Sequence, residues 1–276
     1  MFLARITFGN DNSSDDHDAL KNSAESYLAA LLKNGQIYGE YLFAWSGGTL
    51  TAFTHLTRPD SLAERYHSDW AMSDRNNVIG AFGQPPNCEI IDDDVPDGFP
   101  TWQASSSFYL FTHAFDDASA ICCGDTGRPI PMYLLPITQQ TRESIYFWAR
   151  SYNYHDNIWL GSGALEIQAY KQLADPTADL SVTGRELCAD IERATDIPTF
   201  YFMHRYWGRN DGEPVRLCPV CGGQWHTSDT SAGRQPFHRF HFRCDACRLV
   251  SHCADSYDDD ENARIGEFRQ GNITNP

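Results

Sequence analysis

The sequence predicts an α+β fold, in which a mixed α/β region at the N-terminus precedes a helical middle and a small cysteine-rich module. Three observations predict it. A strand, an amphipathic helix and a hairpin follow one another at the N-terminus, apolar residues recur at helical spacing from residue 141, and two Cys-x-x-Cys pairs lie near the C-terminus. With 276 residues, of which 41% are hydrophobic, the chain can bury a core without cross-links.

The N-terminal elements are the clearest in the chain. Residues 1–8, MFLARITF, alternate as in a strand, and Ser14, Asp15 and Asp16 then supply a cap and first-turn acids for a helix. Asn34-Gly35 is a suitable end for that helix. Residues 36–45 and 49–57, joined by Ser-Gly-Gly, have the pattern of a β-hairpin. The apolar positions that predict the helix are Leu20, Ala24, Tyr27, Leu28, Leu31 and Leu32.

In the middle of the chain, the sequence pattern predicts fewer boundaries of helices and strands. A helix is expected from Ser61, and a strand is expected in SSFYLFTH, residues 106–113. From Thr141 helical patterns dominate, and Thr183-Gly-Arg-Glu186 has the form of a capping box that opens a helix. The apolar run TFYFMHRYW, residues 199–207, predicts a strand that is buried on both faces.

The cysteine-rich module predicts a metal site. Cys218-x-x-Cys221 and Cys244-x-x-Cys247 are separated by 22 residues, a spacing typical of zinc ribbons. Four thiolates complete a tetrahedral shell around one Zn²⁺ and leave no position for water or substrate, so the zinc is expected to be structural. His252 and Cys253 follow the second pair and stay open as substitute ligands.

The charged residues are unevenly distributed along the chain. Residues 1–214 carry 14 Lys and Arg against 29 Asp and Glu, within a total net charge of −16. Residues 215–253 carry five Arg against two Asp and are the only basic region. The sequence therefore predicts an acidic α+β domain over 1–214, a zinc ribbon over 215–253 and an acidic tail over 254–276, much of which is expected to be disordered.

The composition also indicates a compartment. No apolar run approaches the roughly 20 residues that span a bilayer, and the start, MFLARITFGNDN, lacks the basic region of a secretion signal. The nine cysteines are too sparse for a disulfide scaffold. We therefore expect a cytoplasmic protein with reduced thiols and no membrane contact.

Other polar clusters are weaker candidates for function. Four aspartates near the end of the N-terminal third could bind Ca²⁺; they are Asp92, Asp93, Asp94 and Asp97. This segment lacks the glycine and the distal glutamate of a calcium-binding loop, so we expect a solvated loop. An acid/base pair could form among His113, His155 and Asp156. No nucleophile motif accompanies these residues, so we do not expect an enzyme.

Several segments together resemble a known family. The segments ICCGDTGRPIPMYLLP, TGRELCADIERATDIPTFYFMHRYWGR, CPVCGGQW and FRCDACRLVS occur in this order over residues 120–253. They resemble a bacterial family, domain of unknown function 2310, that is described as zinc-ribbon-containing and nucleic-acid-binding. The first loop of that family often carries Cys-Gly-x-Cys, where this chain has Cys123-Gly-Asp-Thr126 after Cys122. The resemblance therefore does not imply a second metal knuckle here, and it implies no enzyme activity.

Two hypotheses about the partner follow. In the first, which we prefer, the acidic surface captures a basic protein in the manner of an inhibitor or an immunity protein. In the second, the ribbon binds nucleic acid through arginines and stacking aromatic rings. The residues that would make these contacts are Arg234, Arg239, Arg243, Arg248, Trp225 and Phe240. Zinc with four thiolates carries a formal charge of about −2, which weakens the second hypothesis.

Overall fold

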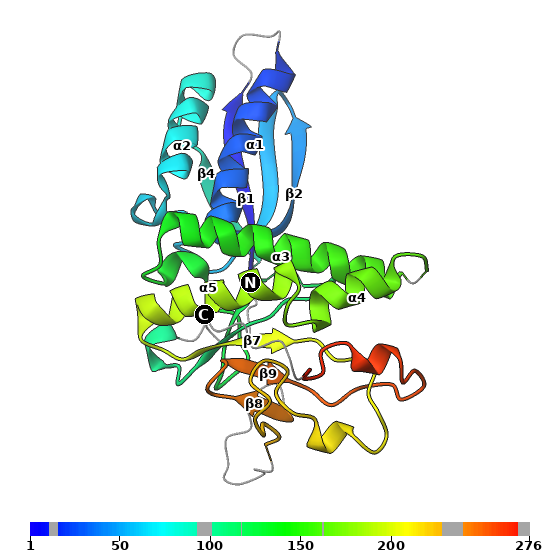
Figure 1. Cartoon of the computed structure of the whole chain (residues 1–276). Coiled ribbons are helices and arrows are strands. Elements are labelled where there is room, and N and C mark those ends of the chain that lie inside the picture. The colour runs from blue at the N-terminus through cyan, green and yellow to red at the C-terminus, as the bar shows by residue number, and fades with distance from the viewer. Residues whose placement is uncertain (11–15, 93–100, 117, 162, 228–239, 270–276) are drawn as a thin grey trace. The chain divides into compact units, whose positions relative to one another are not determined.

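The computed structural model describes residues 1–10, 16–92, 101–116, 118–161, 163–227 and 240–269. It has the mixed α+β structure that the sequence predicts, and Figure 1 shows its helices and strands. Two compact units divide the chain. Unit 1 comprises Met1–Pro100, Asp117–Ser119 and Ile130–Tyr146, and unit 2 comprises Thr101–Asp116, Ala120–Pro129 and Phe147–Pro276.

Unit 1 has the βαββαβ order of the ferredoxin-like motif. Its elements are β1 (Phe2–Asn10), α1 (His17–Asn34), β2 (Ile37–Ser46), β3 (Thr49–Leu56), α2 (Asp69–Phe82) and β4 (Asn87–Asp92). The strands form one antiparallel sheet in the order β2-β3-β1-β4. Alternate side chains of the central strands, such as Ile6 and Leu50, join Leu28 and Val78 of the helices in one buried core.

The local signals of unit 1 behave as predicted at α1 and the hairpin. The Asp16 carboxylate accepts a hydrogen bond of 2.8 Å from the Ala19 amide, and Gly35 ends the helix with φ of 77°. Gly47 and Gly48, with φ of 58° and 82°, make the tight turn between β2 and β3. Ser14 and Asp15 lie outside the described residues.

The helix predicted from Ser61 begins later, at Asp69. The Ser61 hydroxyl is buried and accepts a hydrogen bond of 2.8 Å from the Arg58 amide, so it fixes a turn. Ser68 is the N-cap of α2, and its hydroxyl accepts from the Ala71 amide. Two serines thus offer the same cap chemistry, and tertiary packing decides which of them starts the helix.

Unit 2 contains a mixed sheet with the order β6-β5-β7-β9-β8. The central strands β5 (Phe108–Leu110), β7 (Thr199–Met203) and β9 (Leu249–Ser251) are parallel. The edge strands β6 (Ile121–Cys123) and β8 (Phe242–Cys244) are antiparallel to their neighbours. Helices α4 (Glu166–Ala174) and α5 (Asp179–Thr195) belong to unit 2, and α3 (Gln139–Leu160) belongs to unit 1 up to Tyr146 and to unit 2 from Phe147. No described helix has the length and apolar character needed to cross a membrane.

The predicted capping box at Thr183 and Glu186 is wrong. Helix α5 begins at Asp179, so both residues lie within the helix. Gly184 has a packing role there, because a Cβ atom on it would lie 2.2 Å from Cε2 of Tyr201 in β7. The glycine lets α5 approach the sheet closely.

The cysteine-rich region and the residues after it are integral to unit 2. Strands β8 and β9 continue the sheet formed by β5, β6 and β7, whereas the sequence predicts a domain boundary at residue 214. Residues 254–269, expected to be disordered, include a short 3-10 helix, Asn262–Arg264, with Ala263 and Ile265 buried. Both residues pack against Tyr170 and Trp207, contacts that the sequence does not reveal.

Candidate metal centre

The four predicted ligands form one cluster. The Sγ atoms of Cys218, Cys221, Cys244 and Cys247 all lie within 4.8 Å of one another. The Sγ atoms of Cys221 and Cys244 are 3.7 Å apart. A tetrahedral ion with Zn–S bonds of about 2.3 Å has sulfur atoms about 3.8 Å apart. The cluster therefore has the donor atoms and the size of a four-thiolate metal site.

Each Cys-x-x-Cys pair is closed by a residue in the left-handed conformation. Gly222 follows the first pair with φ of 71°, and its amide donates a 2.8 Å hydrogen bond to the Cys218 carbonyl. The Cys218 amide in turn donates to the Gly223 carbonyl at 2.9 Å. Arg248 follows the second pair with φ of 52°. This turn aims both thiols of a pair toward one point.

Arg248 needs support because a left-handed conformation costs a non-glycine residue about 1–2 kcal/mol. Its guanidinium makes a forked ion pair with Glu192 of α5, with Nη2–Oε1 and Nε–Oε2 distances of 2.7 and 2.9 Å. Its Nη1 also donates to the Asp245 carbonyl at 2.8 Å. The second knuckle is thereby tied to α5 as well as to the sheet.

The thiols differ in their readiness to ionise. Burial, supported by the charge of Cys244, raises the pKa of Cys218 to about 12. Burial and the charge of Cys218 likewise raise the pKa of Cys247. Burial opposes ionisation of Cys221, but hydrogen bonds from the Gly223 amide and the other thiols lower its pKa. A dication must displace protons from this set, so metal affinity is expected to rise with pH.

The alternative ligands lie elsewhere. Among the described residues, the four cysteines are the only set that places three or more ligand atoms together. His252 stacks on the ring of Phe240, and the Cys253 amide donates to Nδ1 of His241 at 3.1 Å. Cys122 and Cys123 are buried in β6.

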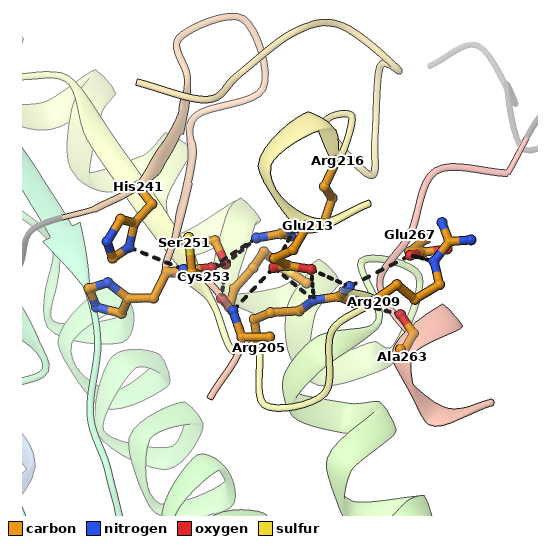
Figure 2. Close-up of polar contacts among 12 residues, drawn as sticks. Arg205, Arg209, Glu213, Arg216, His241, Ser251, Cys253, Ala263 and Glu267 are labelled. Atoms are coloured by element: carbon orange, nitrogen blue, oxygen red, sulfur yellow. Dashed lines mark hydrogen bonds and ion pairs between the residues drawn. The ribbon is translucent and has the colours of Figure 1, made fainter. Parts of the chain in front are cut away.

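A buried ion network includes Arg216, two residues before Cys218, and Figure 2 shows Glu213 between Arg205 and Arg216. The Glu213 carboxylate is 2.8 Å from Nη2 of Arg205 and 3.2 Å from Nε of Arg216. The three side chains are only 1%, 2% and 4% exposed, respectively. Burial and the charge of Arg205 lower the pKa of Arg216 to about 10. Glu213 is therefore the group that allows two cations to be buried together.

The network joins three segments. Arg205 follows β7 and donates to the carbonyls of Ala263 and Ile265 at 2.7 and 3.0 Å. Arg216 precedes the first knuckle and donates to the His252 carbonyl at 2.9 Å. The sequence gives no signal for this network, because its partners are up to 60 residues apart and charged residues are normally exposed.

The described residues proposed for nucleic-acid contact already contact other residues of the protein. Trp225 is 2% exposed, and the Arg216 guanidinium packs 4.8 Å from its ring. Trp225 is therefore buried in the fold, in contrast to the prediction that it stacks on bases. Arg243 pairs with Asp245 at 2.9 Å, Arg248 pairs with Glu192, and Phe240 packs on Tyr109 at 5.1 Å. Arg234 and Arg239 lie outside the described residues.

The structure brings together only some residues of the possible acid/base pair and describes only one residue of the acidic aspartate segment. Asp156 is buried, and its Oδ2 accepts a hydrogen bond of 2.7 Å from Ala114, next to His113. His155 is half-buried, and its Nδ1 lies 2.8 Å from the Ser151 carbonyl of its own helix. The structure thus brings His113 and Asp156 together without His155. Asp92 ends β4, and the other three aspartates of the acidic loop lie outside the described residues.

Three family models match successive parts of the chain, and each is a domain of unknown function. DUF8589 matches residues 1–92, DUF2310 matches residues 103–204, and DUF8594 matches residues 208–257. The first match covers the ferredoxin-like motif of unit 1, and the last contains all four clustered cysteines.

Two uncharacterized proteins of Haemophilus influenzae are similar to this chain. One is 31% identical over 195 residues, which cover 65% of this chain and 91% of that protein. The other is 34% identical over 154 residues, which cover 55% of each chain. A solved structure from Nitrosomonas europaea, provisionally named an antibiotic biosynthesis monooxygenase, covers 34% of this chain at 10% identity with a TM-score of 0.28, too low to support an inference. The chain thus belongs to one family with the first Haemophilus influenzae protein and carries the domain of unknown function DUF2310 at residues 103–204.

Proposed function

We propose that the protein is a non-enzymatic binding protein, in which the four cysteines hold one structural zinc ion and an acidic surface captures a basic protein. The convergence of four Sγ atoms within 4.8 Å supports the metal part of this proposal. Four thiolates fill the tetrahedral shell that Zn²⁺ prefers, so the ion supplies cross-linking and no catalytic position. Such an ion contributes on the order of 10 kcal/mol or more to local folding.

The acidic loop, residues 255–261, is the best-defined part of the acidic surface. Its acids lie within seven residues, and no ion pair joins their carboxylates to another described residue; they are Asp255, Asp258, Asp259, Asp260 and Glu261. All but Asp259 are exposed. A protein with a net charge of −16 attracts basic partners over the whole surface, and this loop offers a local concentration of charge.

The backbone of the acidic loop is fixed at both ends. The amides of Asp255 and Ser256 both donate to the Tyr206 carbonyl at 2.9 Å. At the other end, Arg205 holds the carbonyls of Ala263 and Ile265. A loop that is ordered before binding loses less entropy when the partner arrives. The proposal therefore assigns the buried ion network a role in presenting the loop.

The same contacts weigh against the ribbon as a nucleic-acid site. Arg248 is forked onto Glu192, and Trp225 is buried under Arg216. Phosphate affinity grows with the number of unpaired cations that face the backbone. The described ribbon arginines already have carboxylate partners, so a basic protein is the better fit for this acidic chain.

The proposal is tested by affinity capture with the full chain from a nuclease-treated lysate of the source organism. One variant neutralises the acidic loop through Asp258→Asn, Asp260→Asn and Glu261→Gln. A matched control removes the same charge from exposed sites elsewhere through Glu25→Gln, Glu40→Gln and Glu186→Gln. We expect a basic protein that the wild type and the control retain and that the loop variant loses at least tenfold. Capture that requires nucleic acid, or that is equal for both variants, contradicts the proposal.

A further inference from the structure

A cavity of about 450 Å³ opens in unit 2 where the parallel strands end. Strands β5, β7 and β9 stop at Leu110, Met203 and Ser251, and the residues that directly follow each strand line the cavity. The carboxyl ends of parallel strands are the usual place for a ligand in sheets of this kind. The volume lies within the range of small-molecule sites. This cavity is separate from the four cysteines, none of which lines it.

Six of the fourteen residues that line the cavity are Phe, Tyr or Trp. They come from the ends of β5 and β7 and from the C-terminal half of α3, and they are Phe111, Phe115, Tyr152, Trp159, Phe202 and Tyr206. Edge-to-face contacts hold several of them, with Phe111–Phe202 and Trp159–Tyr206 centroid distances of 4.9 and 5.1 Å. Phe115 is 81% exposed, although it is a large apolar side chain. Aromatic faces of this kind attract a cation within about 6 Å.

The charged groups of the lining are predominantly acidic. Asp156 and Asp255 contribute carboxylates, and Asp156 is only 6% exposed. Arg205 is the one Lys or Arg of the lining, and its guanidinium is already bound to Glu213 and to two carbonyl oxygens. Burial and the charge of His252 lower the pKa of His204 to about 4, so that imidazole is neutral at pH 7. An anionic ligand would meet two carboxylates and no available arginine.

Two polar atoms of the lining residues have no hydrogen-bond partner in the described part of the chain. They are Nε1 of Trp159 and Nε2 of His204, and both are buried. An unpaired buried polar atom costs about 1–3 kcal/mol, so such atoms are rare in folded proteins. Their rings contact each other at a centroid distance of 4.9 Å. With its proton on Nδ1, the neutral His204 ring can accept at Nε2 from an N–H of a cationic ligand, whereas Nε1–H of Trp159 is a donor that a cation does not satisfy.

We propose that this cavity binds an organic cation, a primary ammonium or guanidinium group carried on a compact apolar body. The cationic group lies against the Asp156 carboxylate, and the apolar body packs on the rings that surround Trp159. This inference goes beyond the proposed protein capture and does not depend on it. The same chemistry occurs in a free amine and in a lysine or arginine side chain of a protein.

Isothermal titration calorimetry with three probes that share one ring tests the charge preference. Benzylamine, benzyl alcohol and benzoate differ in charge but not in the phenyl group. We expect benzylamine to bind at least tenfold more tightly than benzyl alcohol, and benzoate not to bind. Equal binding of benzoate and benzylamine would overturn the proposal.

Variants locate the binding within the protein. Asp156→Asn keeps an oxygen that can accept from Ala114 and removes the charge, so it should weaken benzylamine at least tenfold and leave benzyl alcohol unchanged. Asp190→Asn removes an exposed charge of α5 outside the cavity and should change neither probe. Trp159→Leu should weaken both probes. Unchanged benzylamine binding to Asp156→Asn would contradict the assignment, and circular dichroism checks that each variant is folded.

A competition experiment then separates the two sources of the cation. A short peptide with one central lysine is added to protein that holds benzylamine, and the same peptide with norleucine is the control. Displacement by the lysine peptide alone assigns the cavity to a protein side chain. Retention of benzylamine against both peptides assigns it to a free amine. Equal displacement by both peptides would contradict charge recognition.

Discussion

Replacement of Glu213 by glutamine perturbs the most deeply buried charges of the protein. The variant keeps the size of the side chain and an oxygen that can accept from the Ala254 amide, which lies 3.2 Å from Oε1. It removes the negative charge that faces Arg205 at 2.8 Å and Arg216 at 3.2 Å. Two guanidinium groups, 2% and 4% exposed, then remain buried with no charge between them, and Arg205 keeps only the longer ion pair with Glu267 at 3.6 Å.

The expected cost follows from that burial. Removal of one partner from a buried ion pair lowers the free energy of unfolding by about 3–5 kcal/mol, because the remaining charge stays desolvated. Whole domains are stable by only about 5–15 kcal/mol, so this loss is a large fraction of the total. Asp190→Asn is the control. Asp190 pairs with Arg193 at 2.6 Å on the surface of α5, where the two side chains are 45% and 73% exposed, so its loss should cost about 0–1 kcal/mol.

Urea unfolding, followed by circular dichroism and tryptophan fluorescence, measures both variants. We expect the transition of Glu213→Gln to shift to much lower urea than that of Asp190→Asn, with an unchanged slope. Hydrogen exchange should locate the weakened region around residues 254–265, which Arg205 holds. A cost below about 1 kcal/mol for Glu213→Gln, or equal costs for the two variants, would refute the role assigned to Glu213.

Three further predictions concern the metal centre and the cavity. Cys244→Ser should lose the bound metal, whereas Cys253→Ser should retain it, as metal analysis of the reduced proteins will show. Gly222→Ala should lower the free energy of unfolding by at least about 1–2 kcal/mol in urea titration, because φ is 71° and the new Cβ would lie 2.7 Å from the ring of Phe268. Asp156→Asn should raise the melting temperature at pH 7, because burial raises the pKa of this carboxyl and its ionised form destabilises the fold. This gain should vanish in a pH series as the pH falls below about 3.8, where the aspartic acid is protonated in both the folded and the unfolded chain.

Features of the fold that depend on local interactions could be predicted from the sequence. Asp16, Gly35 and the two glycines of the hairpin act through their own backbone neighbours, so their roles can be predicted without the rest of the chain. The metal centre is predictable for a similar reason. The Cys-x-x-Cys spacing fixes a short loop around each pair, and the cluster needs only the two loops to meet.

Features that depend on distant partners could not be predicted. Thr183 and Glu186 have the pattern of a capping box, but α5 begins four residues before Thr183, at Asp179, and packs on Tyr201 of β7 at Gly184. The ring of Trp225 is of a type that stacks on bases, yet the Arg216 guanidinium covers it. The cavity is invisible for the same reason, since its aromatic and acidic residues come from three strand ends and α3, which are adjacent only in the folded chain.

X-ray absorption at the zinc edge of the purified, reduced protein measures the ligand atoms of the ion itself. We expect one zinc per chain, with four sulfur atoms at about 2.3 Å and no nitrogen or oxygen ligand. Such a shell is closed, as a structural ion requires. A shell with a nitrogen or oxygen atom at about 2.0–2.1 Å would mean that a histidine or water completes the site, and it would contradict a purely structural, four-thiolate zinc.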